Sequence, residues 1–184
     1  MPGIAGRAGA VHVRAMASEE RFDVVDNSDR VIGSAPRREV HARGLLHRAV
    51  HVLVSDAAGR VLMQKRSASK DMYPNQWAAS ASGHVDSGED YDTAAVRELG
   101  EELGIFVATV PERLCRIEAC AETGQEFVWV YRLRYEGPIV ANADEISEVS
   151  WHTPAAIDRW TAERPGEFAP SFLLVWARCR DRLA

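Results

Sequence analysis

The pattern of apolar and polar residues predicts a chain in which short strands and helices are mixed. Apolar and polar positions alternate in the strand segments, and three polar or Gly-containing turns each join a pair of these segments. The predicted strands are residues 21–27, 31–35, 48–55, 60–67, 114–121 and 127–135, and segment 144–151 leads into a last strand. The predicted helices are residues 36–44, 89–104, 154–163 and 172–182.

These elements do not repeat as regular βαβ units, so an α/β fold with a mixed sheet is favoured over a doubly wound fold. A chain of 184 residues is long enough for one domain with a full core. We expect residues 19–184 to form that domain, with the N-terminal hairpin included. Residues 1–18 are rich in Gly and Ala and have no long apolar stretch, so we expect a disordered tail and no signal peptide.

Residues 83–105, GHVDSGEDYDTAAVRELGEELGI, carry the strongest candidate chemistry in the chain. Helical periodicity places Glu98, Glu101 and Glu102 on one face, where like charges repel each other. Such a face persists most easily around a divalent cation, and ligands that are all oxygen favour Mg²⁺ or Mn²⁺ over zinc. Gly83 is expected in a loop before the helix, where its backbone can approach a bound group and its carbonyl can ligate a metal.

The spacing of this segment fits the Nudix box, G-x5-E-x7-R-E-U-x-E-E-x-G-U, in which U is apolar. Every defined position is filled, by Gly83, Glu89, Arg97, Glu98, Leu99, Glu101, Glu102, Gly104 and Ile105. A solvated acidic helix with a basic partner would explain an EE pair but not the whole pattern. The chain therefore resembles a Nudix hydrolase, which implies the Nudix fold, a mixed sheet held between helices (α/β/α).

The resemblance also implies a metal site. Glu98, Glu101, Glu102 and the Gly83 carbonyl are expected to hold Mg²⁺, with Mn²⁺ as a possible substitute. Such an ion offsets phosphate charge and lowers the pKa of a bound water. Arg97 is expected to pair with Glu89 or with a box carboxylate and to fix its rotamer rather than to touch substrate.

Two regions of the sequence contain candidates for the general base. Glu102 of the box is one candidate. Glu145 and Glu148, which we place in the loop before the last strand, are the other candidates, unless they are exposed charges. The catalytic candidates are therefore Glu98, Glu102 and Glu145.

Cationic side chains near the box are candidates for binding a diphosphate. Arg66 lies at the end of a predicted strand, and its guanidinium suits bidentate contact with phosphate oxygens. Lys65 is a second candidate, although it and Lys70 could equally belong to a solvated basic loop. His84 follows Gly83 directly and is expected to contact substrate.

The flanking sequence resembles one branch of the superfamily, the proteins similar to type 1 isopentenyl-diphosphate isomerase. The resemblance runs from about residue 21 to the C-terminus and includes His41, Gly44, Leu45, His47, Arg48, the QKRS segment, Gly83-His84 and FAPSF. The isomerase uses a Cys before its Gly-His pair, a Glu on a later strand, and a metal held by His and Glu. Glu126 matches that Glu, and His41, His47 and His84 could match the His ligands.

Two positions depart from the isomerase. Ser82 stands in place of the Cys, and a hydroxyl, with its far higher pKa, is a poor substitute for a thiol in proton transfer. Gly124 stands where another Glu ligand is expected. Because the hydrolase box is intact and the isomerase acid is missing, we predict a hydrolase. His41 and His47 also have a simpler interpretation, as helix-end and strand-start residues with satisfied hydrogen bonds.

Composition limits the partners and the location. The net charge of −5 argues against a nucleic-acid surface. No apolar run approaches the ~20 residues of a membrane span. Three cysteines without CxxC spacing favour reduced thiols in a cytoplasmic protein.

The leading hypothesis is a Mg²⁺-dependent hydrolase of a diphosphate linkage in a nucleoside diphosphate derivative or a related organic diphosphate. One alternative is an isopentenyl-diphosphate isomerase-like enzyme. Another is a catalytically silent Nudix module that binds a ligand, which predicts decay of the box carboxylates, and none is seen. The expected partner is the small diphosphate substrate, and analogy with the family adds a homodimer on weaker grounds.

Overall fold

A mixed sheet of seven strands forms the centre of the molecule, for which a computed structural model describes residues 19–183. Five strands lie in the order β5-β4-β3-β8-β7, while β6 pairs with β3 and β9 pairs with β4. β3 runs parallel to β8, and the other pairs are antiparallel. The strands are β3 (His47–Ser55), β4 (Val61–Arg66), β5 (Trp77–Ala78), β6 (Ala81–His84), β7 (Glu112–Ile117), β8 (Glu126–Arg134) and β9 (Ile146–His152). The tail predicted for residues 1–18 lies outside the described residues.

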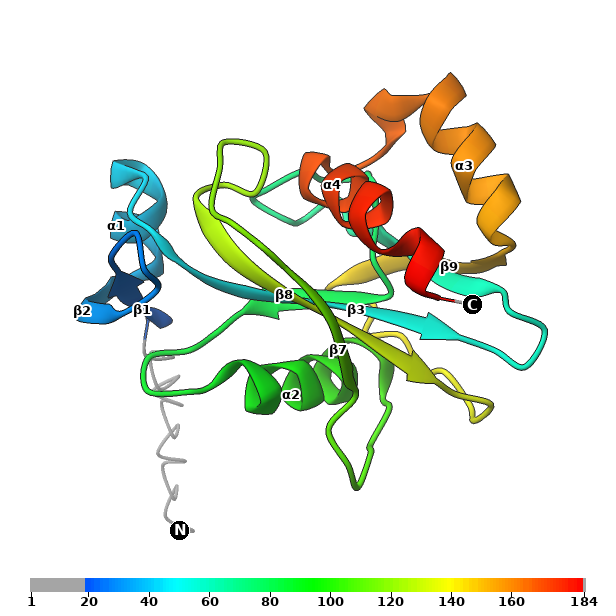
Figure 1. The fold of residues 1–184 in the computed structure, drawn as a ribbon, viewed down its shortest axis with the longest axis horizontal. Coiled ribbons are helices and arrows are strands. Elements are labelled where there is room, and N and C mark those ends of the chain that lie inside the picture. The colour runs from blue at the N-terminus through cyan, green and yellow to red at the C-terminus, as the bar shows by residue number, and fades with distance from the viewer. Residues whose placement is uncertain (1–18, 184) are drawn as a thin grey trace, which may run out of the picture.

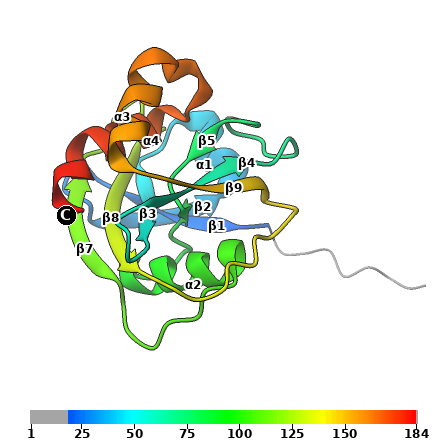
Figure 2. The same ribbon diagram turned by 90° about the vertical axis from the view of Figure 1, so that its right-hand side faces the viewer.

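Helices cover both faces of this sheet (Figures 1 and 2). On one face, α2 (Tyr91–Leu103) packs Leu99 and Leu103 against alternate residues of β3 such as Val52. On the other face lie α3 (Pro154–Glu163) and α4 (Pro170–Cys179), separated by the 3-10 turn Pro165–Glu167. Because alternate strand residues point to opposite faces, the strands contribute apolar side chains to the hydrophobic core on each face of the sheet. The predicted α/β/α architecture, a mixed sheet held between helices, is confirmed.

The box helix α2 is capped at both ends, by Asp90 and by Gly104. The Asp90 carboxylate accepts a hydrogen bond from the Thr93 N–H at 2.8 Å, which satisfies a free donor of the first turn. Gly104 has a left-handed φ of 64°, which glycine adopts without steric cost. Its N–H donates to the Gly100 carbonyl at 3.1 Å. These caps fix which residues of the helix face the sheet.

The N-terminal hairpin forms a separate two-stranded sheet beside the main one. β1 (Arg21–Val25) pairs with β2 (Val31–Pro36), and α1 (Arg37–Arg43) follows directly. Inside this layer, Phe22 packs in a buried cluster with Ala35 and Val40. The turn is tied to the main sheet through Asp29, whose carboxylate accepts hydrogen bonds from Arg48 Nε at 2.6 Å and Tyr91 Oη at 2.9 Å.

Several predicted boundaries were wrong. β3 and β4 form a hairpin but pair only at Ser55 and Val61, because β4 then turns away to pair with β9. The strand predicted for 114–121 ends at Ile117, and the helix predicted for 172–182 begins at Pro170 and ends at Cys179, followed by the 3-10 turn Arg180–Arg182. β5 was not predicted.

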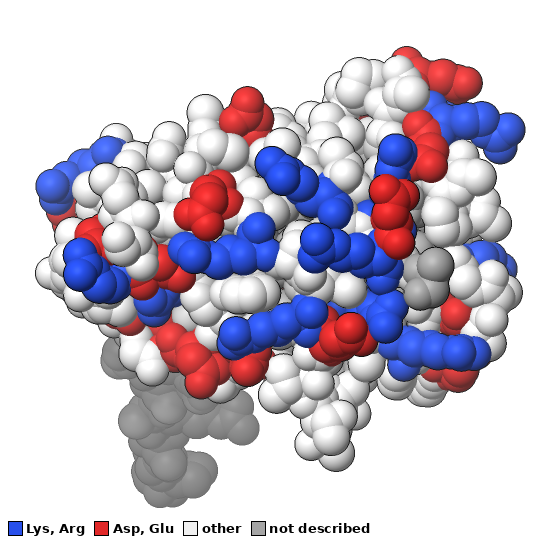
Figure 3. Space-filling view, in the orientation of Figure 1, with Lys and Arg blue, Asp and Glu red and all other residues white. Residues whose placement is uncertain are grey.

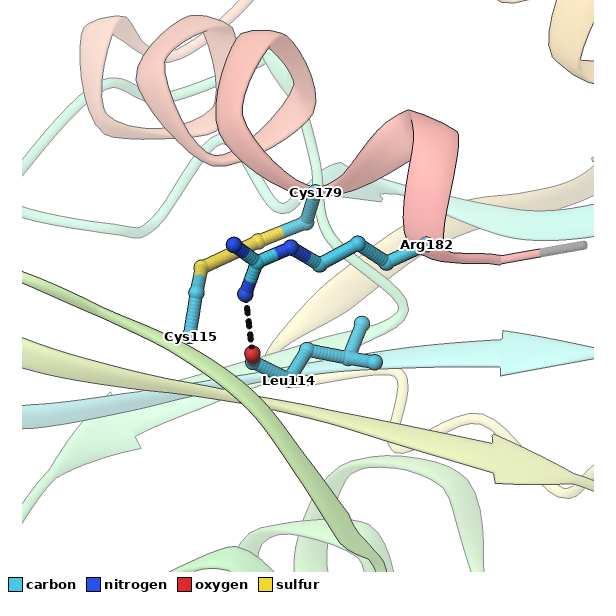
Figure 4. Close-up of a disulfide and its surroundings, with 4 residues drawn as sticks. All are labelled: Leu114, Cys115, Cys179 and Arg182. Carbon is cyan, nitrogen blue, oxygen red and sulfur yellow. Dashed lines mark hydrogen bonds between the residues drawn. A yellow bond between two sulfur atoms is a disulfide. The ribbon is translucent and has the colours of Figure 1, made fainter.

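A disulfide joins the C-terminal helix to the sheet (Figure 4). Cys115 on β7 is bonded to Cys179 at the end of α4, and Cys120 is the free cysteine among residues 19–183. Beside the bond, Arg182 donates a hydrogen bond to the Leu114 carbonyl at 2.6 Å. The prediction of three reduced thiols is therefore corrected: residues far apart in the sequence are brought together by the packing of α4 on β7.

Basic and acidic side chains are interspersed on the face that β7 and β8 cross (Figure 3). Arg113 pairs with Asp92 at 2.7 Å, and Arg132 pairs with Glu112 at 2.8 Å. Positive charge on this face is thus offset locally. Within residues 19–183, no helix has both the length and the apolar composition needed to cross a membrane.

Candidate functional site

A cavity of about 660 Å³ opens between the sheet, the box helix and the N-terminal layer. One wall holds the box carboxylates Glu98, Glu101 and Glu102, and another holds His41 and His84. Strand β6 supplies Ser82 and Gly83 as its floor, since it pairs with β3 along the middle of the sheet. The cavity is large enough for a small organic ligand with several polar groups.

The three box carboxylates differ in exposure. Glu98 and Glu102 are buried at 8% and 3% exposure, whereas the Glu101 side chain is 60% exposed. One Glu102 oxygen accepts hydrogen bonds from Gln64 Nε2 and from the Ser82 N–H, both at 2.9 Å. Glu102 is therefore held in place by β4 and β6, and all three carboxylates line the cavity.

Arg97 connects four carboxylate and carbonyl groups of the box. Its guanidinium donates to both oxygens of Glu89 at 3.0 and 2.9 Å, and to the His84 carbonyl at 2.9 Å. It also donates to Glu98 Oε1 at 2.7 Å and to Glu101 Oε2 at 3.0 Å. A planar fork with all its donors engaged fixes the rotamers of its partners. Arg97 thus pairs with Glu89 and with two box carboxylates, as predicted, while it also lines the cavity.

Gly83 is in direct contact with Glu98. It lies in strand β6 rather than in the predicted loop. A Cβ at this position would overlap the Glu98 carboxylate, with Oε2 only 2.6 Å away. Glycine is therefore required here by the close approach of the carboxylate to the backbone, and not by a special φ angle.

Burial makes the carboxylates difficult to ionise in the metal-free protein. It raises the pKa of Glu98 to about 8, the neighbouring Glu102 adds to the rise, and Arg97 opposes it. Burial also raises the pKa of Glu102 above its ordinary value, against the hydrogen bonds from Ser82 and Gln64. A hard divalent cation would stabilise the ionised forms, so this oxygen donor set fits such an ion.

A second group of metal-ligating side chains lies next to the first. His41, His47, His84 and Glu126 each offer one ligand atom, and these atoms all lie within 4.8 Å of one another. His41 Nε2 and His84 Nε2 are 3.2 Å apart, and His84 Nε2 is 3.1 Å from Glu126 Oε1. His47 Nε2 is buried, 3.5 Å from Glu126 Oε1, and has no hydrogen-bond partner.

His41 is suited to act as a neutral ligand. Burial lowers the pKa of His41 to about 4, helped by the adjacent imidazoles. His47 Nδ1 lies 2.8 Å from the Leu45 carbonyl, which orients the ring with Nε2 toward the cluster. Three nitrogens and one carboxylate oxygen suit a transition ion such as Zn²⁺ or Mn²⁺. The unsatisfied His47 nitrogen contradicts the simpler interpretation of satisfied hydrogen bonds.

Strand alternation places one of the two cationic candidates, Arg66, in the cavity and the other, Lys65, outside it. Arg66 lines the cavity, and its Nε donates to the Met72 carbonyl at 3.0 Å. Lys65, the preceding residue of β4, is not among the lining residues, and its ammonium lies 6.0 Å from the centre of the Trp77 ring. Lys70 lines the cavity in its place. Burial lowers the pKa of both Arg66 and Lys70.

Of the two candidates for the general base near the last strand, only Glu145 lines the cavity. Glu145 lies in the loop before β9. Glu148 lies within β9, opposite Lys65, rather than in the predicted loop, and it does not line the cavity. The structure therefore brings Glu145 together with the box and leaves Glu148 outside.

A family model described as the NUDIX domain matches residues 45–172, which is more than half of the chain. The chain belongs to the Nudix family. It is 37% identical over 180 residues to the Nudix hydrolase YfcD of Escherichia coli, a match that covers 93% of this chain and 92% of that protein. This protein is a Nudix hydrolase with the complete box.

A further relative supports the resemblance to the isomerase branch. This Nudix hydrolase is 32% identical over 164 residues to an isopentenyl-diphosphate Delta-isomerase of Burkholderia multivorans, covering 88% of this chain and 90% of the isomerase. A crystal structure of a Deinococcus radiodurans protein superposes with a TM-score of 0.75 at 32% identity, covering 87% of this chain and 99% of that one. The predicted family and branch are confirmed.

Two features of this Nudix hydrolase were missed by sequence reasoning. Gln64 binds Glu102, and Lys70 forms an ion pair with Glu145. The first was accessible, because Gln64 lies two residues from Arg66 on the same strand and therefore faces the same side. The second joins two loops, and no local signal in the sequence indicates it.

Proposed function

We propose that this Nudix hydrolase cleaves a diphosphate linkage in a nucleoside diphosphate derivative or a related organic diphosphate, with Mg²⁺ as its cofactor. The observation that supports this most strongly is the carboxylate group Glu98, Glu101 and Glu102, which borders a cavity that also contains Arg66 and Lys70. Anionic oxygens on one wall suit metal ions, and the cations opposite suit phosphate.

Each residue has a defined part in this proposal. Glu98, Glu101, Glu102 and the Gly83 carbonyl would hold Mg²⁺, which when bound offsets phosphate charge and lowers the pKa of water. Arg66 binds phosphate oxygens through its terminal nitrogens. Glu145 accepts the proton of the attacking water, because Glu102 is buried and already accepts two hydrogen bonds.

The cluster of His41, His47, His84 and Glu126 favours a second candidate, an isomerase-like reaction, because it also resembles the isomerase metal group. Ser82 weighs against it. This hydroxyl group cannot supply the thiol acid, whereas the complete box is what hydrolysis needs. We assign the cluster to a transition ion in either case, so metal content alone does not separate the two reactions.

A substrate screen with Mg²⁺ tests the proposal. Nucleoside diphosphates, triphosphates, sugar nucleotides and isopentenyl diphosphate are supplied, and released phosphate or pyrophosphate is measured with parallel detection of dimethylallyl diphosphate. We expect hydrolysis that EDTA abolishes. Isomerised product without hydrolysis would establish the second candidate, and turnover unaffected by EDTA would contradict a metal-dependent reaction.

Variants of the box test the metal site itself. Glu101→Gln and Glu102→Gln are each expected to lower kcat by about 100-fold, the size typical of losing one electrostatic stabiliser, and to weaken Mg²⁺ affinity. Glu163→Gln, on α3 and outside the cavity, is the matched control. Normal Mg²⁺-dependent turnover in both box variants would contradict the proposed ligands.

A further inference from the structure

Lys70 and Glu145 form an ion pair across two loops at the edge of the cavity. Lys70 lies in the loop between β4 and β5, and Glu145 lies in the loop between β8 and β9. Their side chains are 20% and 37% exposed, so both are partly accessible from the cavity side. Lys70, a cation suited to binding phosphate, is therefore paired with Glu145, the carboxylate proposed to accept the proton of the attacking water.

The backbone of both loops is fixed, so the pair can break without moving either loop. The Ser67 N–H donates to the Glu145 carbonyl at 2.9 Å, and Ser69 Oγ donates to the Asp144 carbonyl at 3.2 Å. The turn before Glu145 is in turn attached to the box helix, because the Asn142 N–H donates to the Glu102 carbonyl at 2.9 Å. Only the two side chains need to change partner.

Two of the other cations that line the cavity, Arg97 and Arg37, are each held by more than one carboxylate. Arg97 is engaged by the box carboxylates, and Arg37 is paired with Glu20 at 2.8 Å and Asp71 at 3.0 Å. Lys70 has a single partly exposed pair, and such pairs are weak. A diphosphate with several negative oxygens would therefore compete effectively for Lys70.

We propose that Lys70 exchanges partners when substrate binds: it holds Glu145 in the free protein and moves to a substrate phosphate, which releases the Glu145 carboxylate to act as base. The second half of this proposal, the action of the released Glu145 as a base, rests on the proposed function. In that step the water oxygen forms the new P–O bond and one water proton passes to Glu145. The P–O bond to the leaving phosphate breaks, and the leaving group departs with the electron pair.

The exchange makes Lys70 a residue that determines specificity. A ligand that places no phosphate beside Lys70 leaves Glu145 occupied, so bound water is not activated. The exchange of partners by Lys70 therefore selects for ligands with a phosphate group at this position, and other ligands of the cavity are not hydrolysed.

A double-mutant cycle on binding tests the exchange without requiring turnover. The probe is methylenediphosphonate with Mg²⁺, measured by isothermal titration calorimetry on the full chain. Lys70→Met is expected to weaken binding by at least about tenfold, because it removes a charged phosphate contact. Glu145→Gln is expected to tighten binding about two- to fivefold, the size of one partly exposed ion pair, and to have no effect when Lys70 is already Met.

Asp144→Asn is the matched control, because it removes the same charge from the adjacent position outside the cavity, and binding should stay unchanged. Equal tightening by Glu145→Gln with and without Lys70 would show a general charge effect and overturn the exchange. Weaker binding by Glu145→Gln, or no binding to the unsubstituted protein, would also overturn it.

Kinetics separate this inference from the proposed function. On a hydrolysed substrate, Glu145→Gln should lower kcat at least tenfold without raising KM, whereas Lys70→Met should mainly raise KM. A purely structural ion pair would change both constants alike in both variants. If the screen finds no hydrolysis, the proposed function fails, but the binding cycle still decides whether Lys70 changes partner.

Discussion

Replacing Gly83 by alanine tests whether the position of the Glu98 carboxylate controls turnover. The added methyl group would lie 2.6 Å from Glu98 Oε2 and closer still to the other carboxylate atoms. Ordinary contact between such atoms begins near 3.4 Å, so the nearest carboxylate oxygen must move by more than about 1 Å.

The displaced group is the end of a side chain, so the fold should survive the change. Overpacking of this kind costs roughly 1–3 kcal/mol of unfolding free energy. The Glu98 carboxylate is also held by Arg97 at 2.7 Å, and that hydrogen bond would be lost as the carboxylate moves. A misplacement of about 1 Å at a reacting centre can lower the rate by about 100-fold.

We therefore expect Gly83→Ala to retain its circular dichroism spectrum, to bind Mg²⁺ more weakly and to lose about 100-fold in kcat. Gly33→Ala on β2 is the control, because no atom outside its immediate neighbours lies within 4 Å of the added methyl group. Both variants should be assayed with the same substrate and a Mg²⁺ titration. Wild-type kcat and Mg²⁺ affinity in Gly83→Ala would refute the role assigned to Glu98.

Three further predictions follow from the geometry. Arg97→Lys should lower kcat by about tenfold or more with the fold intact, because an ammonium cannot hold Glu89 and Glu98 through a planar fork; steady-state kinetics checks this. The folded-state pKa of Glu98, about 8, lies above its ordinary value of 4.5, so the folded protein retains a proton that the unfolded chain releases between these pH values. The stability of the EDTA-treated protein should therefore fall as pH rises through this window, by up to about 1.4 kcal/mol per pH unit, and Glu98→Gln should reduce the slope in thermal melts. Reduction of the Cys115–Cys179 bond should cost about 2–4 kcal/mol of unfolding free energy, and Cys115→Ser should be insensitive to reductant in the same denaturation assay.

Local sequence was sufficient to predict the box helix and the family. Asp90 and Gly104 act as caps through contacts within one turn of the chain, so their effect does not depend on the rest of the fold. The spacing of Glu98, Glu101 and Glu102 fixes a shared face for the same reason. The confirmed family membership rests on this segment and on its flanks.

Contacts between distant segments could not be predicted in the same way. The choice between Lys65 and Arg66 depends on the phase of β4, and a one-residue difference in phase reverses which side chain faces the cavity. The ion pair of Lys70 with Glu145 depends on β4 leaving β3 to pair with β9. These features are determined by tertiary packing, for which the sequence alone offers no local pattern.

The N-terminal layer has a consequence for how this enzyme could diversify. Phe22, Arg37 and His41 line the cavity, yet all three precede residue 45, where the match to the NUDIX domain begins. The segment is attached to the domain through Asp29, and also through Asp23, whose carboxylate accepts hydrogen bonds from Ser87 and Gly88. Part of the cavity wall and the box carboxylates are thus encoded in different stretches of the gene. Recombination that exchanges residues 19–44 among relatives would replace part of the cavity wall and leave the box unchanged. Such an exchange would change which ligands fit the cavity.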